Sequence, residues 1–306
     1  MKHIKKPSLR LLLMLFAAML MTACEKAVFD ENEPPDTPET PTNENLVTLT
    51  FNIAQLEQTS FSAITQQMRS TEAAKVCSRI TLALYQDDAR VKYINQKADD
   101  DFGKFTLTVP SGNYKLLALA HSCDGNATTT ALNKITFPNN KVTDTFYYAA
   151  DINATADMSQ QLVLNRIVAM VRFVFNDAIP ENVARLKFYY TGGSSTLDGT
   201  TGLGCVNSKQ TEYRTVDSHE AGAQFELFTL PHDKSGELKM TVSALDAADN
   251  VVKEMTFDAV PITVNTISEY SGNFFNSGSK DDNPSSASAF TLMVEDKWEK
   301  VSTYSF

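Results

Sequence analysis

The chain has 306 residues, of which 37 are acidic and 27 basic, so its formal net charge at pH 7 is −10. This charge argues against nucleic acid or an anionic membrane surface as a binding partner. The content of Phe, Tyr, Val and Thr favours β-strands, and no long helical period or repeat of about 20 to 50 residues is visible.

The N-terminus has the pattern of a secretory signal. Basic residues at positions 2, 5, 6 and 10 precede an unbroken apolar run over 11–20. That run is shorter than the about 20 residues that a membrane-spanning helix needs. Residues 21–24 read Met-Thr-Ala-Cys and resemble the bacterial lipobox, whose cysteine receives a diacylglycerol. We predict a lipoprotein signal peptide over 1–23 and lipidation of Cys24; the alternative is a plain signal peptide with an incidental cysteine.

An acidic, proline-rich segment follows over 24–45. It contains four prolines and several carboxylates, and it lacks the apolar residues that would build a core. Such a composition predicts a disordered, self-repelling spacer. Acidic residues just after the cysteine also resemble the surface-export signals of Bacteroidota lipoproteins.

The next part of the chain, 46–158, reads as a first β-sandwich. Apolar and polar residues alternate in short runs, and Pro110 to Asn113 has the composition of a turn between two such runs, which predicts a hairpin. The predicted strands are 46–53, 76–85, 91–96, 105–109 and 114–120, with one or two more over 141–154.

The remainder, 159–306, reads as a second β-sandwich. Residues 160–177 are apolar on both faces and are interpreted as a central strand pair with Arg166 between the strands. Residues 194–204 are interpreted as a glycine-rich loop. Further strands are predicted within 179–193 and at 223–231, 236–246 and 251–263. The fold class is therefore all-β, with two tandem transthyretin-like sandwiches behind a signal peptide and a disordered spacer.

A polar linker over 276–289 leads to a terminal strand over 290–301. Phe290, Leu292 and Val294 alternate with more polar residues, and Trp298, the only tryptophan, follows. A strand behind a flexible linker can pair at the edge of its own domain or at the open edge of a neighbour. Its own domain is favoured, because the linker keeps the strand at a high effective concentration there.

The sequence offers few candidates for a disulfide, a catalytic group or a metal site. Cys77 and Cys123 bracket strand-like runs and could form one disulfide, but we favour the alternative that all three cysteines of the mature domains, Cys205 included, are small buried apolar residues. His121 beside Cys123 and the sequence around His219 do not have the spacing of a nucleophilic pair or of a metal site. The chain is therefore predicted not to be an enzyme and to bind no metal or cofactor.

The order of these features resembles one known family. The stretches FGKFTLTVPSGNYKLLALAH (102–121), LVLNRIVAMVRFVF (162–175) and AIPENVARLKFYYTGGSSTLDGTTGLG (178–204), behind a lipobox and an acidic spacer, are similar to the FimB-like anchor and accessory subunits of Bacteroidota type V pili. The resemblance covers about Leu46 to Val301. It implies export as a lipoprotein to the outer membrane, exposure on the cell surface, other fimbrial subunits as partners, and assembly by β-strand exchange.

The resemblance also assigns roles to residues. A stalk subunit loses its first strand to an arginine-directed protease, whereas an anchor keeps it, here Leu46 to Ile53. Phe290 to Val301, with Phe290, Leu292, Val294 and Trp298, would be the donor strand. Arg69 is the first arginine after Cys24, and a cut there would instead make the chain a stalk or tip subunit. We favour the alternative that Arg69 is an ordinary surface arginine. A surface glycan-binding lipoprotein is the alternative from another class, and a host or bacterial surface ligand is left open.

Overall fold

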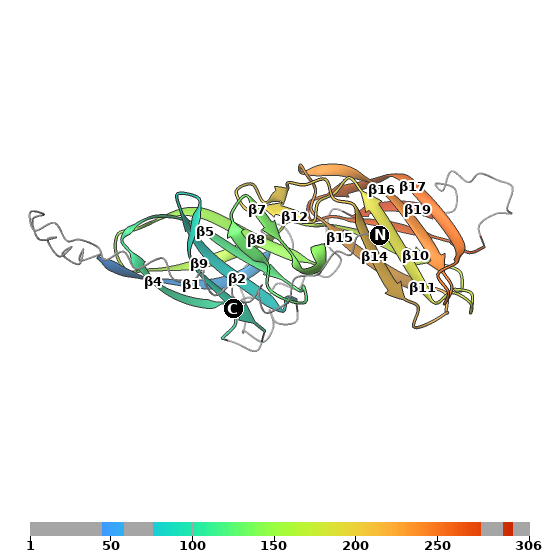
Figure 1. The fold of residues 1–306 in the computed structure, drawn as a ribbon, viewed down its shortest axis with the longest axis horizontal. Helices are drawn as coiled ribbons and strands as arrows, with labels where there is room; N and C mark the ends of the chain where they lie inside the picture. Colours follow the sequence, from blue (N-terminus) through green and yellow to red (C-terminus); the bar gives the residue numbers. More distant parts are fainter. Residues whose placement is uncertain (1–44, 58–75, 99–100, 277–289, 296–306) are drawn as a thin grey trace, which may run out of the picture. The chain divides into compact units, whose positions relative to one another are not determined.

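The computed structural model describes residues 45–57, 76–98, 101–276 and 290–295, all within one compact unit, Glu44–Phe306. These residues form three sheets, two of which have four strands, and a short 3-10 turn at Pro138–Asn140 (Figure 1). The predicted all-β fold is confirmed. Among the described residues there is no helix with the length and apolar character of a membrane span.

The largest sheet, sheet A, contains every described strand up to residue 166, here called the first half of the chain, and two short strands from the part that follows, the second half. In spatial order they are β13 (Leu203–Gly204), β12 (Thr196–Asp198), β7 (Lys134–Thr136), β6 (Thr128–Ala131), β3 (Ala89–Lys97), β2 (Arg79–Gln86), β5 (Gly112–His121), β8 (Thr145–Ala154), β9 (Met158–Arg166), β1 (Leu46–Glu57) and β4 (Lys104–Pro110).

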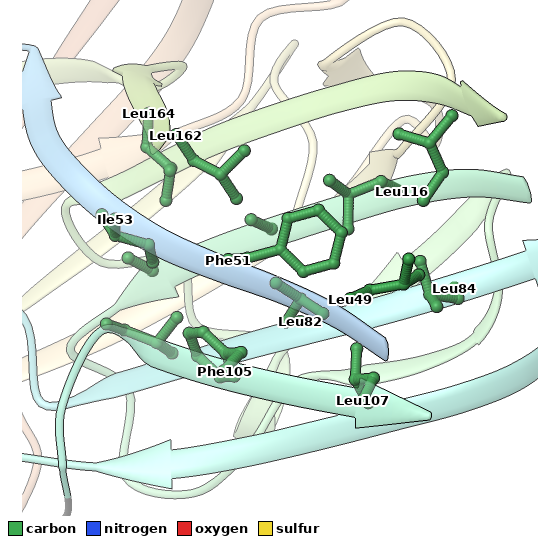
Figure 2. Close-up of a cluster of buried hydrophobic side chains, with 14 of the residues drawn as sticks. Leu49, Phe51, Ile53, Leu82, Leu84, Phe105, Leu107, Leu116, Leu162 and Leu164 are labelled. Atoms are coloured by element: carbon green, nitrogen blue, oxygen red, sulfur yellow. The ribbon is translucent and has the colours of Figure 1, made fainter. Parts of the chain in front are cut away.

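The first core lies between the β4–β1–β9 part of sheet A and its β2–β5 part. Alternation along β1 directs Leu49, Phe51 and Ile53 to one face, and all three side chains are fully buried. Figure 2 shows them in a cluster with Leu82, Leu84, Phe105, Leu107, Leu116, Leu162 and Leu164. The first strand of the domain therefore supplies the centre of its core.

Sheets B and C enclose the second core. Sheet B has the order β15 (Ala223–Thr229), β10 (Ala169–Phe175), β18 (Ile267–Gly272) and β19 (Phe290–Glu295); sheet C has the order β14 (Gln210–Thr215), β11 (Arg185–Thr191), β16 (Ser235–Leu245) and β17 (Val251–Thr263). The middle of this core is aromatic. Phe173 lies with its ring centroid 5.1 Å from that of Phe257 and 5.8 Å from that of Phe188, in the range of favourable aromatic pairs.

The predicted strand pair over 160–177 is wrong in its pairing. The region does form two strands, β9 and β10, but β9 pairs with β1 in sheet A and β10 pairs with β15 and β18 in sheet B. β10 is largely buried, whereas β9 buries one face and exposes the other. The predicted domain boundary after residue 158 falls at the start of β9, and the division into two domains stays a prediction.

A third buried cluster joins the two halves of the chain. The outward faces of β2 and β5 place Ala83, Tyr85, Leu117 and Leu119 against residues of the second half, among them Val168, Met170, Leu197, Leu230 and Ile267. The predicted glycine-rich loop forms part of this joint, because β12 within it pairs with β7 through Leu197 and Ile135. The glycines there allow close packing.

Gly199 lies where this packing leaves no room for a side chain. A Cβ atom at Gly199 would lie 2.7 Å from the carbonyl oxygen of Leu132 and 2.8 Å from Cδ1 of Ile135. We expect Gly199→Ala to lower the free energy of unfolding by about 1–3 kcal/mol, because the overpacked backbone must move. In Gly236→Ala, where the nearest atom is 3.8 Å away, the change should stay within about 0.5 kcal/mol. Urea unfolding of both variants checks this, and equal losses would contradict it.

Candidate functional site

The first strand is held along both edges. β1 pairs antiparallel with β4 over 46–52 and parallel with β9 over 49–57, with an irregularity between Ile53 and Gln55. The amide N–H of Thr48 also donates to Oδ1 of Asp157 at 2.7 Å. Because both edges are paired and the inward side chains are buried, the groove that contains β1 is filled by the chain itself.

Among the described residues, the last strand has a pairing partner along one edge only. β19 pairs antiparallel with β18, from Ile267↔Glu295 to Gly272↔Phe290, and it ends sheet B. The structure thus shows the intramolecular one of the two predicted pairings. Phe290 is 6% exposed and Leu292 is 40% exposed, so of these two predicted donor residues only Phe290 enters the core.

Phe290 occupies a slot made by aromatic rings. Its ring centroid lies 5.5 Å from Phe257, 6.1 Å from Phe175 and 6.2 Å from Phe173, each in an edge-on arrangement. Removal of β19 would therefore uncover both a row of backbone groups on β18 and an apolar slot, which together are what an added strand recognises.

Several predicted sites lie outside the described residues. Cys24 and the spacer, Arg69 and Trp298 are in segments for which the structure gives no description. Val294 lies in β19, but only its backbone is described. Lipidation and cleavage therefore stay predictions from the sequence.

The three cysteines of the described residues form no disulfide. Arg79 pairs with His121 across β2 and β5, so continuing this register would place Cys77 opposite Cys123. The two side chains nevertheless lie in different cores, Cys77 in the one that contains β1 and Cys123 in the one that joins the two halves. The expectation that all three are buried is right for Cys77 and Cys123 and wrong for Cys205, which is exposed.

His121 and Cys123 do not form a nucleophilic pair. The amide N–H of Cys123 donates to Nδ1 of His121 at 3.1 Å, and the Cys123 thiol donates to the carbonyl oxygen of Lys141 at 3.2 Å. Burial lowers the pKa of His121 to about 4, with a smaller effect from Arg79, while burial raises the pKa of Cys123. A nucleophilic thiolate needs the opposite shifts, a lowered cysteine pKa beside a basic partner.

The buried histidine makes stability depend on pH. Its pKa is about 4 when folded against an ordinary 6.5, so the unfolded chain binds the proton more tightly. The contribution of His121 to stability is fully present above pH 6.5 and is lost as the pH falls toward 4, by about 3 kcal/mol in total. Urea unfolding of the native chain and of His121→Gln between pH 7.5 and 4 isolates this term, since the carboxylates are common to both. Parallel profiles would contradict it.

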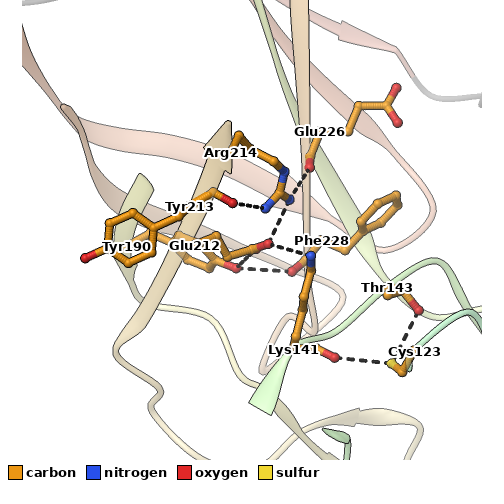
Figure 3. Close-up of polar contacts among 9 residues, drawn as sticks. All are labelled: Cys123, Lys141, Thr143, Tyr190, Glu212, Tyr213, Arg214, Glu226 and Phe228. Carbon is orange, nitrogen blue, oxygen red and sulfur yellow. Dashed lines mark hydrogen bonds and ion pairs between the residues drawn. The ribbon is translucent and has the colours of Figure 1, made fainter. Parts of the chain in front are cut away.

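One buried carboxylate, that of Glu212, is the centre of a group of polar contacts at the edge of the second sandwich (Figure 3). Glu212 on β14 accepts from the Tyr190 hydroxyl and from Nη2 of Arg214, both at 2.8 Å, and its Oε2 lies 3.5 Å from Nζ of Lys141. The same Arg214 nitrogen donates to the carbonyl oxygen of Glu226 on β15. These groups satisfy one another and link the edges of sheets C and B with Lys141 of the first half, which is a structural role.

A depression of about 730 Å³ lies near the turn between β2 and β3. Its lining includes carboxamides and carboxylates such as Asn113, Asn153 and Asp151. The rings of Tyr85 and Tyr114, which also line it, are buried, and their hydroxyls donate to backbone carbonyls at 2.6 Å. The described residues that line the depression thus offer no exposed aromatic platform on which a sugar ring would stack. In the described part of the chain no His, Cys, Asp and Glu side chains gather as a group of three that could hold a metal ion.

Several solved structures are similar to this chain at low sequence identity. The fimbrial anchor protein Mfa2 of Porphyromonas gingivalis is 10% identical over 85% of this chain and 100% of that chain, with a TM-score of 0.46. A candidate polysaccharide-binding protein of Bacteroides thetaiotaomicron is 11% identical over 85% and 98%, with a TM-score of 0.48. A candidate adhesin of Bacteroides ovatus is 13% identical over 70% and 82%, with a TM-score of 0.47.

No curated protein matches the chain. The sequence profile of the fimbrillin-A-associated anchor proteins Mfa1 and Mfa2, however, matches residues 41–303. This is a family of structural proteins of the fimbrium and the cell surface, not of enzymes. The predicted resemblance to fimbrial anchor and accessory subunits is confirmed, and the chain belongs to the family of fimbrillin-A-associated anchor proteins.

Proposed function

We propose that the chain is a lipid-anchored fimbrial subunit that ties a pilus to the outer membrane. A diacylglycerol on Cys24 holds the chain, and the acidic spacer over 24–45 sets the sandwiches away from the membrane surface. The protein joins the fibre by β-strand complementation with other fimbrial subunits. Its place is at the cell surface, at the base of the fimbrium or as an accessory component.

The observation that carries this proposal is the filled groove around β1. A subunit that accepts a donor strand must first vacate a groove, whereas β1 is paired along both edges here and buries Leu49, Phe51 and Ile53. Retaining this strand blocks elongation at this end of the molecule. A chain that is held at its N-terminus and closed at its first groove has the properties of an anchor.

The strand offered to the fibre is β19. It lies at the end of sheet B, one edge is paired, and Phe290 is its buried side chain among those described. Segment 277–289 before it can span up to roughly 45 Å when extended. The strand can therefore reach a neighbouring subunit without unfolding the sheets that precede it.

The N-terminus of the native protein tests the proposal. We expect mass spectrometry of the protein from purified cell envelopes to give an acylated Cys24 followed by an intact β1. A mature N-terminus at Ser70, after a cut at Arg69, would show that lipid, spacer and first strand are released together, which makes the chain a stalk or tip subunit. An unmodified Cys24 would overturn the lipid anchor.

A further inference from the structure

One buried carboxylate holds the chain just before the segment that leads to the last strand. Asp177, in the connection between β10 and β11, is 6% exposed. Its Oδ1 accepts the amide N–H of Phe274 at 2.9 Å, and its Oδ2 accepts those of Phe275 at 2.6 Å and Asn276 at 2.7 Å. Three consecutive amides converge on one carboxylate, so the bonds are charge-assisted and fix this turn.

The turn at Phe274 to Asn276 and the slot for Phe290 both contact the ring of Phe175. Phe274 stacks on Phe175 with centroids 4.7 Å apart and planes at 6°, and Phe275 meets the same ring edge-on at 6.1 Å. Phe175 also lies 6.1 Å from Phe290. Loosening the turn would therefore disturb one wall of the slot that retains β19.

We propose that Asp177 is the positioning residue that keeps β19 in its own chain. By fixing Phe274 to Asn276, the carboxylate sets the point from which segment 277–289 departs. It also holds the Phe175 wall of the slot in place around Phe290. Loss of the carboxylate shifts β19 from its paired form toward the released form that a partner can take up. This inference rests on the donor role of β19 proposed above.

Hydrogen exchange in the full-length chain tests the positioning role. Asp177→Asn keeps the side-chain shape but replaces one acceptor oxygen with an amide group that cannot accept an N–H. We expect the amides of 290–295 to exchange about tenfold to a hundredfold faster in this variant, while those of β1 keep their protection. Asp217→Asn, at an exposed carboxylate, is the matched control and should leave both regions unchanged. An equal rise at β1 and β19 would show a merely structural role and overturn the inference.

A second measurement separates this inference from the proposed function. A fluorescent peptide of residues 288–298 is added to Asp177→Asn and to the native chain. Faster uptake by the variant, with no uptake of the same peptide carrying Phe290→Ala, supports both the retention of β19 by Asp177 and strand complementation. Faster exchange of β19 without uptake of the peptide supports retention by Asp177 and overturns strand complementation at this edge. Unchanged exchange of β19 overturns the role of Asp177 alone.

Discussion

Asp144→Ala is expected to lower the free energy of unfolding by about 3–5 kcal/mol, because it leaves a buried guanidinium without its charged partner. The Arg166 side chain is 1% exposed. Its Nε and Nη2 donate to the two carboxylate oxygens of Asp144 at 2.6 and 2.8 Å, and its Nη1 donates to Asn265 at 3.3 Å. Arg166 ends β9 in sheet A, and Asn265 lies in the turn before β18, so the pair fastens the joint between the two halves.

Urea unfolding followed by circular dichroism measures this effect. Glu226→Ala is the matched control, because Glu226 is 42% exposed and Arg172, its partner, also pairs with Glu269. That variant should lose less than about 1 kcal/mol. The double variant Asp144→Leu with Arg166→Met should recover most of the stability, since apolar replacements remove the buried charge together with its partner. A loss of similar size in both single variants would contradict a special role for the buried pair.

Sequence patterns could predict the strands whose two faces differ. Alternation on either side of a Pro-Ser-Gly-Asn turn predicted the strands β4 and β5, and the run 251–263 coincides with β17. The predicted hairpin between β4 and β5 is wrong, because β4 pairs with β1 while β5 pairs with β2 and β8. In β4 and β17, one face meets a core and the other is more exposed, so the period of two is visible. Short apolar runs with strong β-forming residues indicate a strand regardless of its partner.

Pairing between distant segments could not be predicted in the same way. β18 was missed because Ser268, Glu269 and Ser271 make it polar, although it lies between β10 and β19. Leu197 pairs with Ile135 only because the two halves meet. These features depend on contacts between residues far apart in the sequence, which local periodicity does not contain.

The candidate site was likewise predictable only where local sequence carries the signal. The apolar alternation of β19 predicted a strand able to exchange, and residues 290–295 form a strand at a sheet edge. Asp177 was not predicted, because an aspartate after Phe175 and Asn176 has the appearance of an ordinary turn residue. Its three amide donors come from the far end of the domain, so no signal near Asp177 could have indicated them.

The two strands at the ends of the described chain should differ sharply in their resistance to opening. Phe51→Ala removes a fully buried ring from the centre of the first core, and we expect it to lower the free energy of unfolding by about 3–5 kcal/mol. Phe290→Ala removes a ring from an edge strand, so its main effect should be local release of β19 with the sheets otherwise intact.

Hydrogen exchange resolved by segment distinguishes these outcomes. In the native chain the amides of β1 should exchange only by global unfolding, since both of its edges are paired, whereas those of β19 should exchange by a cheaper local opening. Phe290→Ala should accelerate exchange in 290–295 and along β18 but leave β1 protected, and Phe51→Ala should accelerate exchange throughout the first sandwich. If β1 opens as readily as β19 in the native chain, the groove around β1 is not closed, and the chain is able to accept a donor strand there as a polymerising subunit does.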